Sequence, residues 1–395
     1  MVGTATLVTL VIASLASLFM AWSIGAGSSG STPFAPAVGA NAISVMRAGF
    51  VVGILGLLGA VLQGANVTEA VGKELVVGVT LSPVAATVGL LVAATLVAIG
   101  VFAGYPIATA FTVTGAVVGA GLSMGGAPAW NKYQEIATLW VLVPFVGGGI
   151  AYGTAVMLRD DRVPERVAVP LLAALVGLIL ANVGFVLLGP AGEAASIAET
   201  IADAFSGPPL ATRAAVSLVL AAAIAFVLWR DLVRDEAAGQ RHFLLAMGGL
   251  VAFSAGGSQV GLALGPLLPL LDETSLALPL PGLLLAGGLG LLAGSWTGAP
   301  RMIKALSQDY SALGPRRSIA ALIPSFAIAQ TAVFFGIPVS FNEIIVSAIV
   351  GSGYAAGGAG VSREKMVKTV LAWAGSLVLA FLASYGAFLA VDAAL

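Results

Sequence analysis

The stretch I-G-A-G-S-S-G-S-T-P-F-A-P-A-V-G-A-N, residues 24–41, decides how this chain folds. It interrupts an apolar sequence with four glycines, two prolines and a group of hydroxyl side chains, so it cannot be an ordinary lipid-facing helix. Irregular backbone at membrane depth is stable only where it lines protein or a water-filled cavity. The stretch F-S-A-G-G-S-Q-V-G-L-A-L-G-P, residues 253–266, predicts a weaker interruption of the same kind. Two such interruptions in corresponding halves point to the binding site of a transporter.

Composition places the chain in the membrane. Of its 395 residues, 59% are hydrophobic and 9% charged, whereas soluble domains carry roughly 25% charged residues. The net charge of −1 gives no nucleic-acid footprint, and the absence of cysteine excludes disulfides and thiolate metal sites. The single histidine, His242, excludes a multi-histidine metal site. An enzyme would need a nucleophile beside a base or a metal cluster. Neither is visible, so we expect a membrane protein that is not an enzyme and uses no cofactor.

Apolar segments long enough to span, or nearly span, a bilayer predict about twelve passes, with some of them re-entrant hairpins. They run approximately over 3–22, 44–63, 82–102, 105–123, 135–157, 168–189, 212–229, 242–260, 276–296, 318–336, 338–355 and 368–392.

Four groups of basic residues predict the orientation of these passes. They are Arg159, Arg162 and Arg166; Arg230, Arg234 and Arg241; Arg301, Lys304, Arg316 and Arg317; and Arg363, Lys365 and Lys368. Counting passes puts all four groups on one side, which the positive-inside rule makes cytoplasmic. We therefore expect a multi-pass protein of the cell membrane with both termini outside.

An internal repeat is the strongest feature of the sequence. G-Y-P-I-A-T-A-F-T-V-T-G-A-V-V-G-A-G from Gly104 aligns without gaps with G-I-P-V-S-F-N-E-I-I-V-S-A-I-V-G-S-G from Gly336. Because seven passes separate equivalent segments, the two copies face opposite ways across the membrane. The sequence thus predicts an all-α polytopic fold with an inverted-topology repeat, divided into a first repeat (1–157), connecting helices (158–240) and a second repeat (241–395). Carriers that work by alternating access have this architecture, with the site at the midplane.

The predicted binding site combines the glycine- and hydroxyl-rich stretches with the two G-x-P turns. Each turn starts a short helix, whose free N–H groups and positive dipole end suit an anion. We expect the half-helices after Pro106 and Pro338 to point their N-termini at one another. The candidate substrate-binding residues are Ser28, Ser29, Ser31, Thr32, Thr109, Ser258, Gln259, Ser340 and Asn342. The alternative for any single serine or threonine is close helix packing.

Glu343 is the carboxylate that the sequence places inside a predicted spanning segment and away from its ends. An acidic group at that depth is costly and usually functional, and one that exchanges its proton could couple transport to a proton gradient. The alternative is a neutral glutamic acid that only bonds a neighbouring helix.

These segments together resemble the inorganic phosphate transporter family, whose members carry phosphate, or in some branches sulfate, with sodium or protons. The family pattern G-A-N-D-x-A-N followed by a glycine-rich stretch looks like A-G-S-S-G-S-T-P-F-A-P-A-V-G at 26–39, and its second copy looks like G-G-S-Q-V-G-L-A-L-G-P at 256–266. The pattern G-x-P-x-S-T-T-H looks like G-Y-P-I-A-T-A-F at 104–111 and G-I-P-V-S-F-N-E at 336–343. The resemblance covers both repeats.

The resemblance implies a secondary carrier for phosphate first and sulfate second, with a passive anion channel as the alternative. The family's two sodium-binding aspartates fall on Ser29 and Gln259. A sodium site without a carboxylate is expected to be weak, so the sequence leaves proton and sodium coupling open and assigns no metal site. The expected partners are phosphate or sulfate and the lipid bilayer, and a homodimer is left open.

Overall fold

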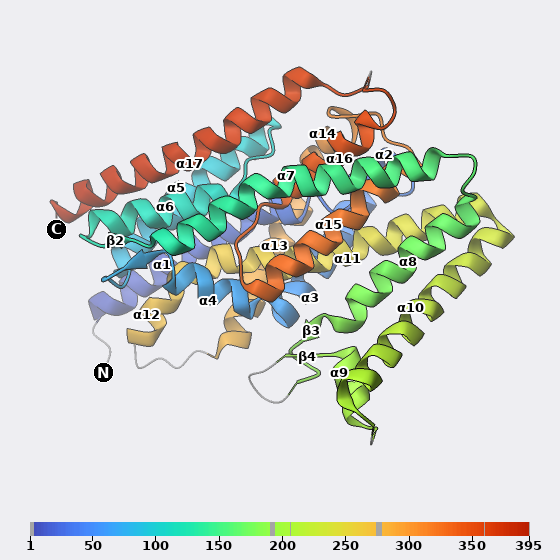
Figure 1. Ribbon diagram of the computed structural model, residues 1–395. Helices are drawn as coiled ribbons and strands as arrows, with labels where there is room; N and C mark the ends of the chain where they lie inside the picture. The colour runs from blue at the N-terminus through green and yellow to red at the C-terminus, as the bar shows by residue number, and fades with distance from the viewer. Residues whose placement is uncertain (1–3, 190–193, 206, 274–278, 359, 395) are drawn as a thin grey trace.

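The computed structural model describes residues 4–189, 194–205, 207–273, 279–358 and 360–394, and this part is almost entirely helical (Figure 1). The long helices are α1 (Thr4–Ile24), α3 (Val45–Gln63), α5 (Pro83–Ala103), α7 (Trp130–Arg159), α8 (Glu165–Asn182), α10 (Pro209–Arg234), α11 (Glu236–Leu264), α13 (Leu280–Thr297), α15 (Pro315–Phe335) and α17 (Arg363–Asp392). The shorter helices are α2 (Ala35–Gly39), α4 (Ala65–Lys73), α6 (Thr109–Ser123), α9 (Ile197–Asp203), α12 (Leu268–Glu273), α14 (Ala299–Gln308) and α16 (Phe341–Tyr354). A π-helical turn η1 (Gly25–Ser29) and a 3-10 turn η2 (Gly265–Leu267) complete the helical set.

Two short antiparallel ladders connect the helices. Strand β1 (Val76–Val77) pairs with β2 (Ala127–Pro128), and β3 (Gly184–Phe185) pairs with β4 (Ala195–Ser196). Neither ladder closes into a larger sheet in the described part of the chain. The protein is therefore an all-α structure.

Ten helices in the described ranges are long and apolar enough to cross a membrane. Each of the twelve predicted apolar segments overlaps one helix. Ten of these helices are the candidate spans, and the other two are α6 and α16, which are too short to cross a bilayer. The first residues of the predicted segments 3–22 and 276–296 lie outside the described residues. The chain is thus a multi-pass membrane protein.

Two helical hairpins have the same local design. Helices α5 and α15 both end at a glycine with positive φ, 73° at Gly104 and 63° at Gly336. Glycine suits these turns because other residues are strained in the left-handed region. After each glycine a short non-helical segment leads into α6 or α16, which packs back along the helix before it. Both hairpins therefore carry the start of a short helix into the protein interior.

The predicted second interruption at residues 253–266 is wrong over most of its length. Helix α11 runs unbroken to Leu264, and the backbone departs from it only at η2. The glycines in this stretch serve helix packing instead: a Cβ on Gly256 would lie 1.9 Å from the carbonyl oxygen of Gly56 in α3. Small residues let two helix backbones approach closely in a membrane, so glycine content here reports a close contact and not a break.

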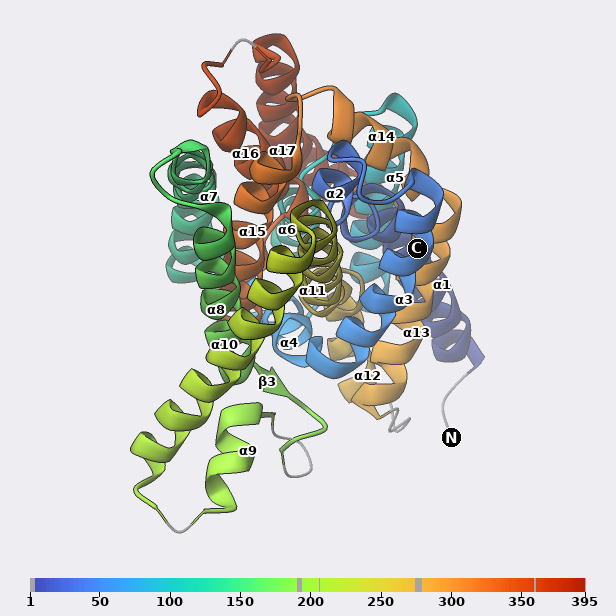
Figure 2. The same cartoon turned by 90° about the vertical axis from the view of Figure 1, so that its right-hand side faces the viewer.

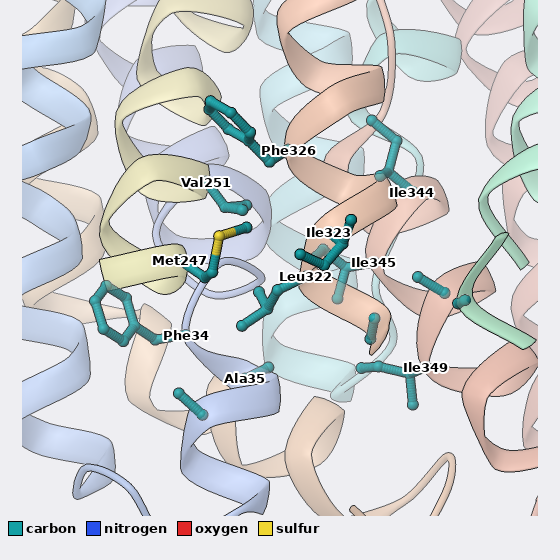
Figure 3. Close-up of a cluster of buried hydrophobic side chains, with 14 of the residues drawn as sticks. Phe34, Ala35, Met247, Val251, Leu322, Ile323, Phe326, Ile344, Ile345 and Ile349 are labelled. Carbon is teal, nitrogen blue, oxygen red and sulfur yellow. The ribbon is translucent and has the colours of Figure 1, made fainter. Parts of the chain in front are cut away.

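An apolar layer holds the centre of the bundle together where α11, α15 and α16 meet. Figure 3 shows Met247 and Val251 of α11 beside Phe326 of α15, with Ile344 of α16 nearby. Phe34, which follows the broken stretch after α1, packs into the same layer. Its ring lies so close to α11 that a Cβ on Gly248 would come within 2.9 Å of it. This layer anchors the irregular backbone against the most enclosed helices.

Helices α8, α9 and α10 form an arm at the side of the bundle (Figure 2). The arm is joined to the bundle at the end where α7 leads into α8. There the Glu165 side chain is buried and accepts hydrogen bonds from Gln240 of α11 and Arg316 of α15. Residues of three helices thus meet at one carboxylate.

Candidate functional site

The first predicted interruption is present, and its own hydroxyls stabilise it. Helix α1 ends at Ile24 and opens into the π-helical turn η1. Ser31 Oγ and Thr32 Oγ1 both donate to the Ser28 carbonyl oxygen, at 3.2 and 3.0 Å. Gly25 is required because a Cβ there would lie 2.1 Å from the Leu291 carbonyl oxygen of α13. Ser31 and Thr32 therefore hold the break itself.

A buried group of polar side chains joins the break to both hairpins, and Gln259 of α11 is at its centre. Gln259 Oε1 accepts a hydrogen bond from Thr109 Oγ1 at 2.8 Å and another from Ser28 Oγ at 3.2 Å. Its Nε2 donates to the Val339 carbonyl oxygen at 2.7 Å. Thr109 is the first residue of α6, and Val339 directly precedes the cap of α16. One amide thus links the break, α6 and the turn before α16.

Asn342, in the first turn of α16, makes the reciprocal connection. Its Nδ2 donates to the carbonyl oxygens of Gly27 and Ile107, at 2.9 and 2.6 Å. Gly27 belongs to η1, and Ile107 lies in the turn before α6. The starts of α6 and α16 are therefore brought together around the break. We call Ser28, Thr109, Gln259 and Asn342 the central cluster.

The remaining candidate residues, Ser29, Ser258, Ser340 and Glu343, lie outside the central cluster and differ in their contacts. Ser29 and Ser258 are both buried. Ser340 accepts a hydrogen bond from the Glu343 backbone N–H at 3.4 Å and so caps α16. Ser258 Oγ and Glu343 Oε2 are buried without a hydrogen-bond partner among the described residues, as is Oδ1 of Asn342. Buried polar atoms are normally paired, so three unpaired ones in this region indicate capacity to bind a ligand.

Two tryptophans that are not among the predicted site residues hold the hairpin turns. Trp373 Nε1 of α17 donates to the Pro106 carbonyl oxygen at 2.7 Å, and Trp140 Nε1 of α7 donates to the Pro338 carbonyl oxygen at 3.1 Å. Each tryptophan follows one hairpin in sequence and bonds the turn of the other. The two tryptophans follow the aligned segments at nearly the same offset in sequence, and this was the signal that could have found them.

The electrostatics of the central cluster are those of neutral dipoles. Its side chains carry no formal charge, and all four are inaccessible to solvent. Within the described residues, no group of three or more histidine, cysteine or acidic side chains could hold a metal ion. The carbonyl oxygens of Gly27, Ile107 and Val339, which could face a cation, are bonded to side-chain amides. These neutral groups lie at the starts of α6 and α16, where the positive end of each helix dipole favours an anion.

Several known proteins are similar to this chain over nearly its whole length. A sequence model described as the phosphate transporter family matches residues 24–384. A predicted phosphate permease of Thermococcus kodakarensis is 24% identical over 388 residues, covering 92% of this chain and 93% of that protein. The chloroplastic inorganic phosphate transporter 2-1 of Arabidopsis thaliana is 26% identical, and the match covers 90% of this chain and 67% of that protein. A solved structure of a sodium-dependent phosphate transporter has a TM-score of 0.81 at 23% identity and covers 98% of this chain and 100% of its own, which shows the same fold.

Proposed function

Because the chain belongs to the phosphate transporter family, we propose that it is a secondary active transporter that carries inorganic phosphate by alternating access. The single observation that carries this proposal is the meeting of the α6 and α16 N-termini at the central cluster. Helix N-termini and neutral hydroxyl and amide donors bind a tetrahedral oxyanion without a fixed positive charge. Such a site holds phosphate and can also release it. Sulfate offers the same oxygen geometry and is the second candidate substrate.

The proposal of alternating access rests on two observations: the central cluster is buried, and the two helical hairpins have the same local design. Ser28, Thr109, Gln259 and Asn342 are all fully buried, so the site is closed to both sides. A passive channel would instead need an open path at some stage of conduction. The helix after each hairpin holds the turn of the other hairpin, through Trp140 of α7 and Trp373 of α17. This is expected if residues 1–157 and 241–395 are inverted repeats that move against each other. Transporters of this architecture rock one repeat against the other around a site at the midplane.

Glu343 is the proposed coupling residue. It lies in the first turn of α16 next to Asn342, and its Oε2 has no partner in the described structure. A neutral carboxyl group there can donate a hydrogen bond to phosphate, whereas a carboxylate repels it. Proton and anion then bind cooperatively, as linkage requires for symport. Sodium is the less favoured ion because the buried carbonyl oxygens of Gly27 and Val339 are already bonded to the Asn342 and Gln259 amides.

The proposed orientation places both termini outside. Arg159 and Arg234 lie at the end of the bundle where α7 leads into α8 and α10 leads into α11 (Figure 1), and Arg316 bonds Glu165 there. Basic residues gather on the cytoplasmic side of membrane proteins. The arm of α9 and the start of α10 then face outward.

Uptake of labelled phosphate into proteoliposomes tests the function, with a pH gradient, a sodium gradient or neither, and with sulfate as competitor. We expect accumulation driven by an inward proton gradient and little effect of sodium. Glu343→Gln is expected to preserve phosphate exchange and to abolish accumulation driven by pH. If this variant accumulates phosphate with unchanged pH dependence, Glu343 is not the coupling residue.

A further inference from the structure

A large cavity with a partly polar lining lies outside the central cluster, on the side of the protein that carries the α9 arm. Its volume is about 880 Å³. It is lined by residues of the C-terminal end of α15, the junction of α3 and α4, and α8, α9 and α10. Its polar lining residues are Gln63, Asn66, Asn182, Ser196, Glu199, Arg213, Gln330 and Thr331. The other lining residues are apolar or glycine, so the cavity offers hydrogen-bonding groups on part of its wall.

Arg213 is the one cationic residue that lines this cavity in the described part of the chain. Its Nη2 lies 2.6 Å from Glu199 Oε1. Its Nε is buried and has no hydrogen-bond partner among the described residues. A guanidinium group carries five N–H donors in a planar fork that matches phosphate oxygens. The ion pair with Glu199 therefore leaves donor capacity that an oxyanion can use.

Neighbouring helices hold Arg213 and Glu199 in place. Ser217 Oγ donates to the Arg213 carbonyl oxygen at 2.8 Å and accepts from Asn182 Nδ2 at 2.9 Å, which ties α10 to α8. Glu199 forms a capping box with Ser196 at the start of α9. Both charged groups are thus positioned by well-bonded backbone. The carboxylate competes with any bound anion for Arg213, which keeps such binding weak enough to be reversible.

The inner wall of the cavity separates it from the central cluster by a short distance. Gln330 Nε2 of α15 donates to Ser254 Oγ at 2.6 Å and to Gln63 Oε1 at 3.3 Å, so two lining residues, Gln63 and Gln330, are joined to Ser254 of α11. Ser254 and Gln259 are on the same helix, five residues apart, which corresponds to about 7.5 Å along the axis. The cavity thus ends little more than one helical turn from the proposed phosphate site.

We propose that this cavity is an outer loading site for phosphate, in which the anion displaces Glu199 from Arg213 before it moves to the central cluster. The hydrogen-bonded contact of Gln63, Gln330 and Ser254 is the inner barrier that opens to let it pass. This inference rests on the proposed transport function and adds a second anion site to it.

Kinetics from the side that carries the α9 arm test the role of Arg213. Arg213→Gln is expected to raise the KM for phosphate about tenfold with kcat within about twofold, as for loss of a charge-assisted contact made on binding. Arg213→Lys should restore part of the affinity, and Glu199→Gln should lower the KM because it frees Arg213. Raising the ionic strength from about 0.01 M to about 1 M shortens the Debye length from about 30 Å to about 3 Å, so charges attract phosphate over a shorter distance. The higher ionic strength should raise the KM of the wild type for phosphate and leave the KM of Arg213→Gln nearly unchanged. The control is Lys368→Gln, which removes an exposed ion pair with Glu364. Its KM should rise with ionic strength as the wild-type KM does.

The absence of native cysteine allows a direct binding measurement. Thr331 lines the cavity and is exposed, so Thr331→Cys is expected to react with a membrane-impermeant thiol reagent added to that side. Inorganic phosphate should slow the reaction, and Arg213→Gln should abolish this protection. If the single-cysteine protein transports phosphate but shows no protection, and Arg213→Gln leaves the KM unchanged, the loading site is wrong and the carrier function stands. If the wild type moves no phosphate, the proposed function itself fails.

Discussion

Replacing Gln259 by leucine removes the centre of the cluster without leaving a large cavity. The variant loses the hydrogen bonds from Ser28 and Thr109 and the bond to the Val339 carbonyl oxygen. A buried carbonyl without its partner costs about 1–3 kcal/mol, and each neutral hydrogen bond contributes about 0.5–1.5 kcal/mol. The two hydroxyls already lie 3.4 Å apart and can bond each other. The expected loss of unfolding free energy is therefore about 2–4 kcal/mol.

Two measurements follow the effect of Gln259→Leu. Equilibrium unfolding in mixed micelles reports the change in stability, and labelled phosphate uptake into proteoliposomes reports function. Uptake per folded molecule should fall more than tenfold, because Ser28, Thr109 and the turn before α16 lose the group that positions them. A loss of about 1.4 kcal/mol in the free energy of phosphate binding is already a factor of ten. Thr112→Val is the matched control: Thr112 lies one turn from Thr109 on α6 and its hydroxyl bonds only within its own helix, so it should cost under about 1.5 kcal/mol and preserve uptake. Wild-type stability and uptake in Gln259→Leu would refute the assignment of the cluster.

Three further changes test separate parts of the account. Gln259→Asp adds a carboxylate beside backbone carbonyl groups, so phosphate uptake should become stimulated by sodium; uptake that stays independent of sodium contradicts the view that the amide occupies a cation position. Trp373→Phe removes the donor to the Pro106 carbonyl oxygen and should slow uptake several-fold, unlike the exposed Trp130→Phe, and equal rates would show that the turn needs no such bond. Gly256→Ala puts a methyl group 1.9 Å from the Gly56 carbonyl oxygen and should cost about 1–3 kcal/mol or more, whereas Gly386→Ala in open space should cost nothing measurable.

The sequence predicted the helical segments well because hydrophobic length alone determines which parts of a chain span a bilayer. It also predicted that the segments after Pro106 and Pro338 meet, since the ungapped alignment of the two copies required equivalent positions for both. The contacts between Thr109, Gln259 and Asn342 agree with that prediction.

The errors have a common physical origin in tertiary contacts. Glycines in a helix break cannot be told from glycines at a helix crossing by sequence alone. The sequence therefore predicts Gly256 as part of an interruption, whereas it lies inside helix α11. The distinction depends on Gly56, which lies on another helix. Backbone acceptors were also invisible: the Gly27 and Val339 carbonyl oxygens have no side-chain signature. The cavity at Arg213 is assembled from six helices, and no sequence motif marks it.

Counterflow of labelled phosphate tests the central claim most directly. Proteoliposomes loaded with unlabelled phosphate are diluted into a trace of labelled phosphate, without any ion gradient. A carrier that alternates its site between the two sides predicts transient, saturable accumulation of label inside, abolished in Gln259→Leu. Label that only equilibrates at a rate proportional to its concentration, with no stimulation by internal phosphate, would contradict the account.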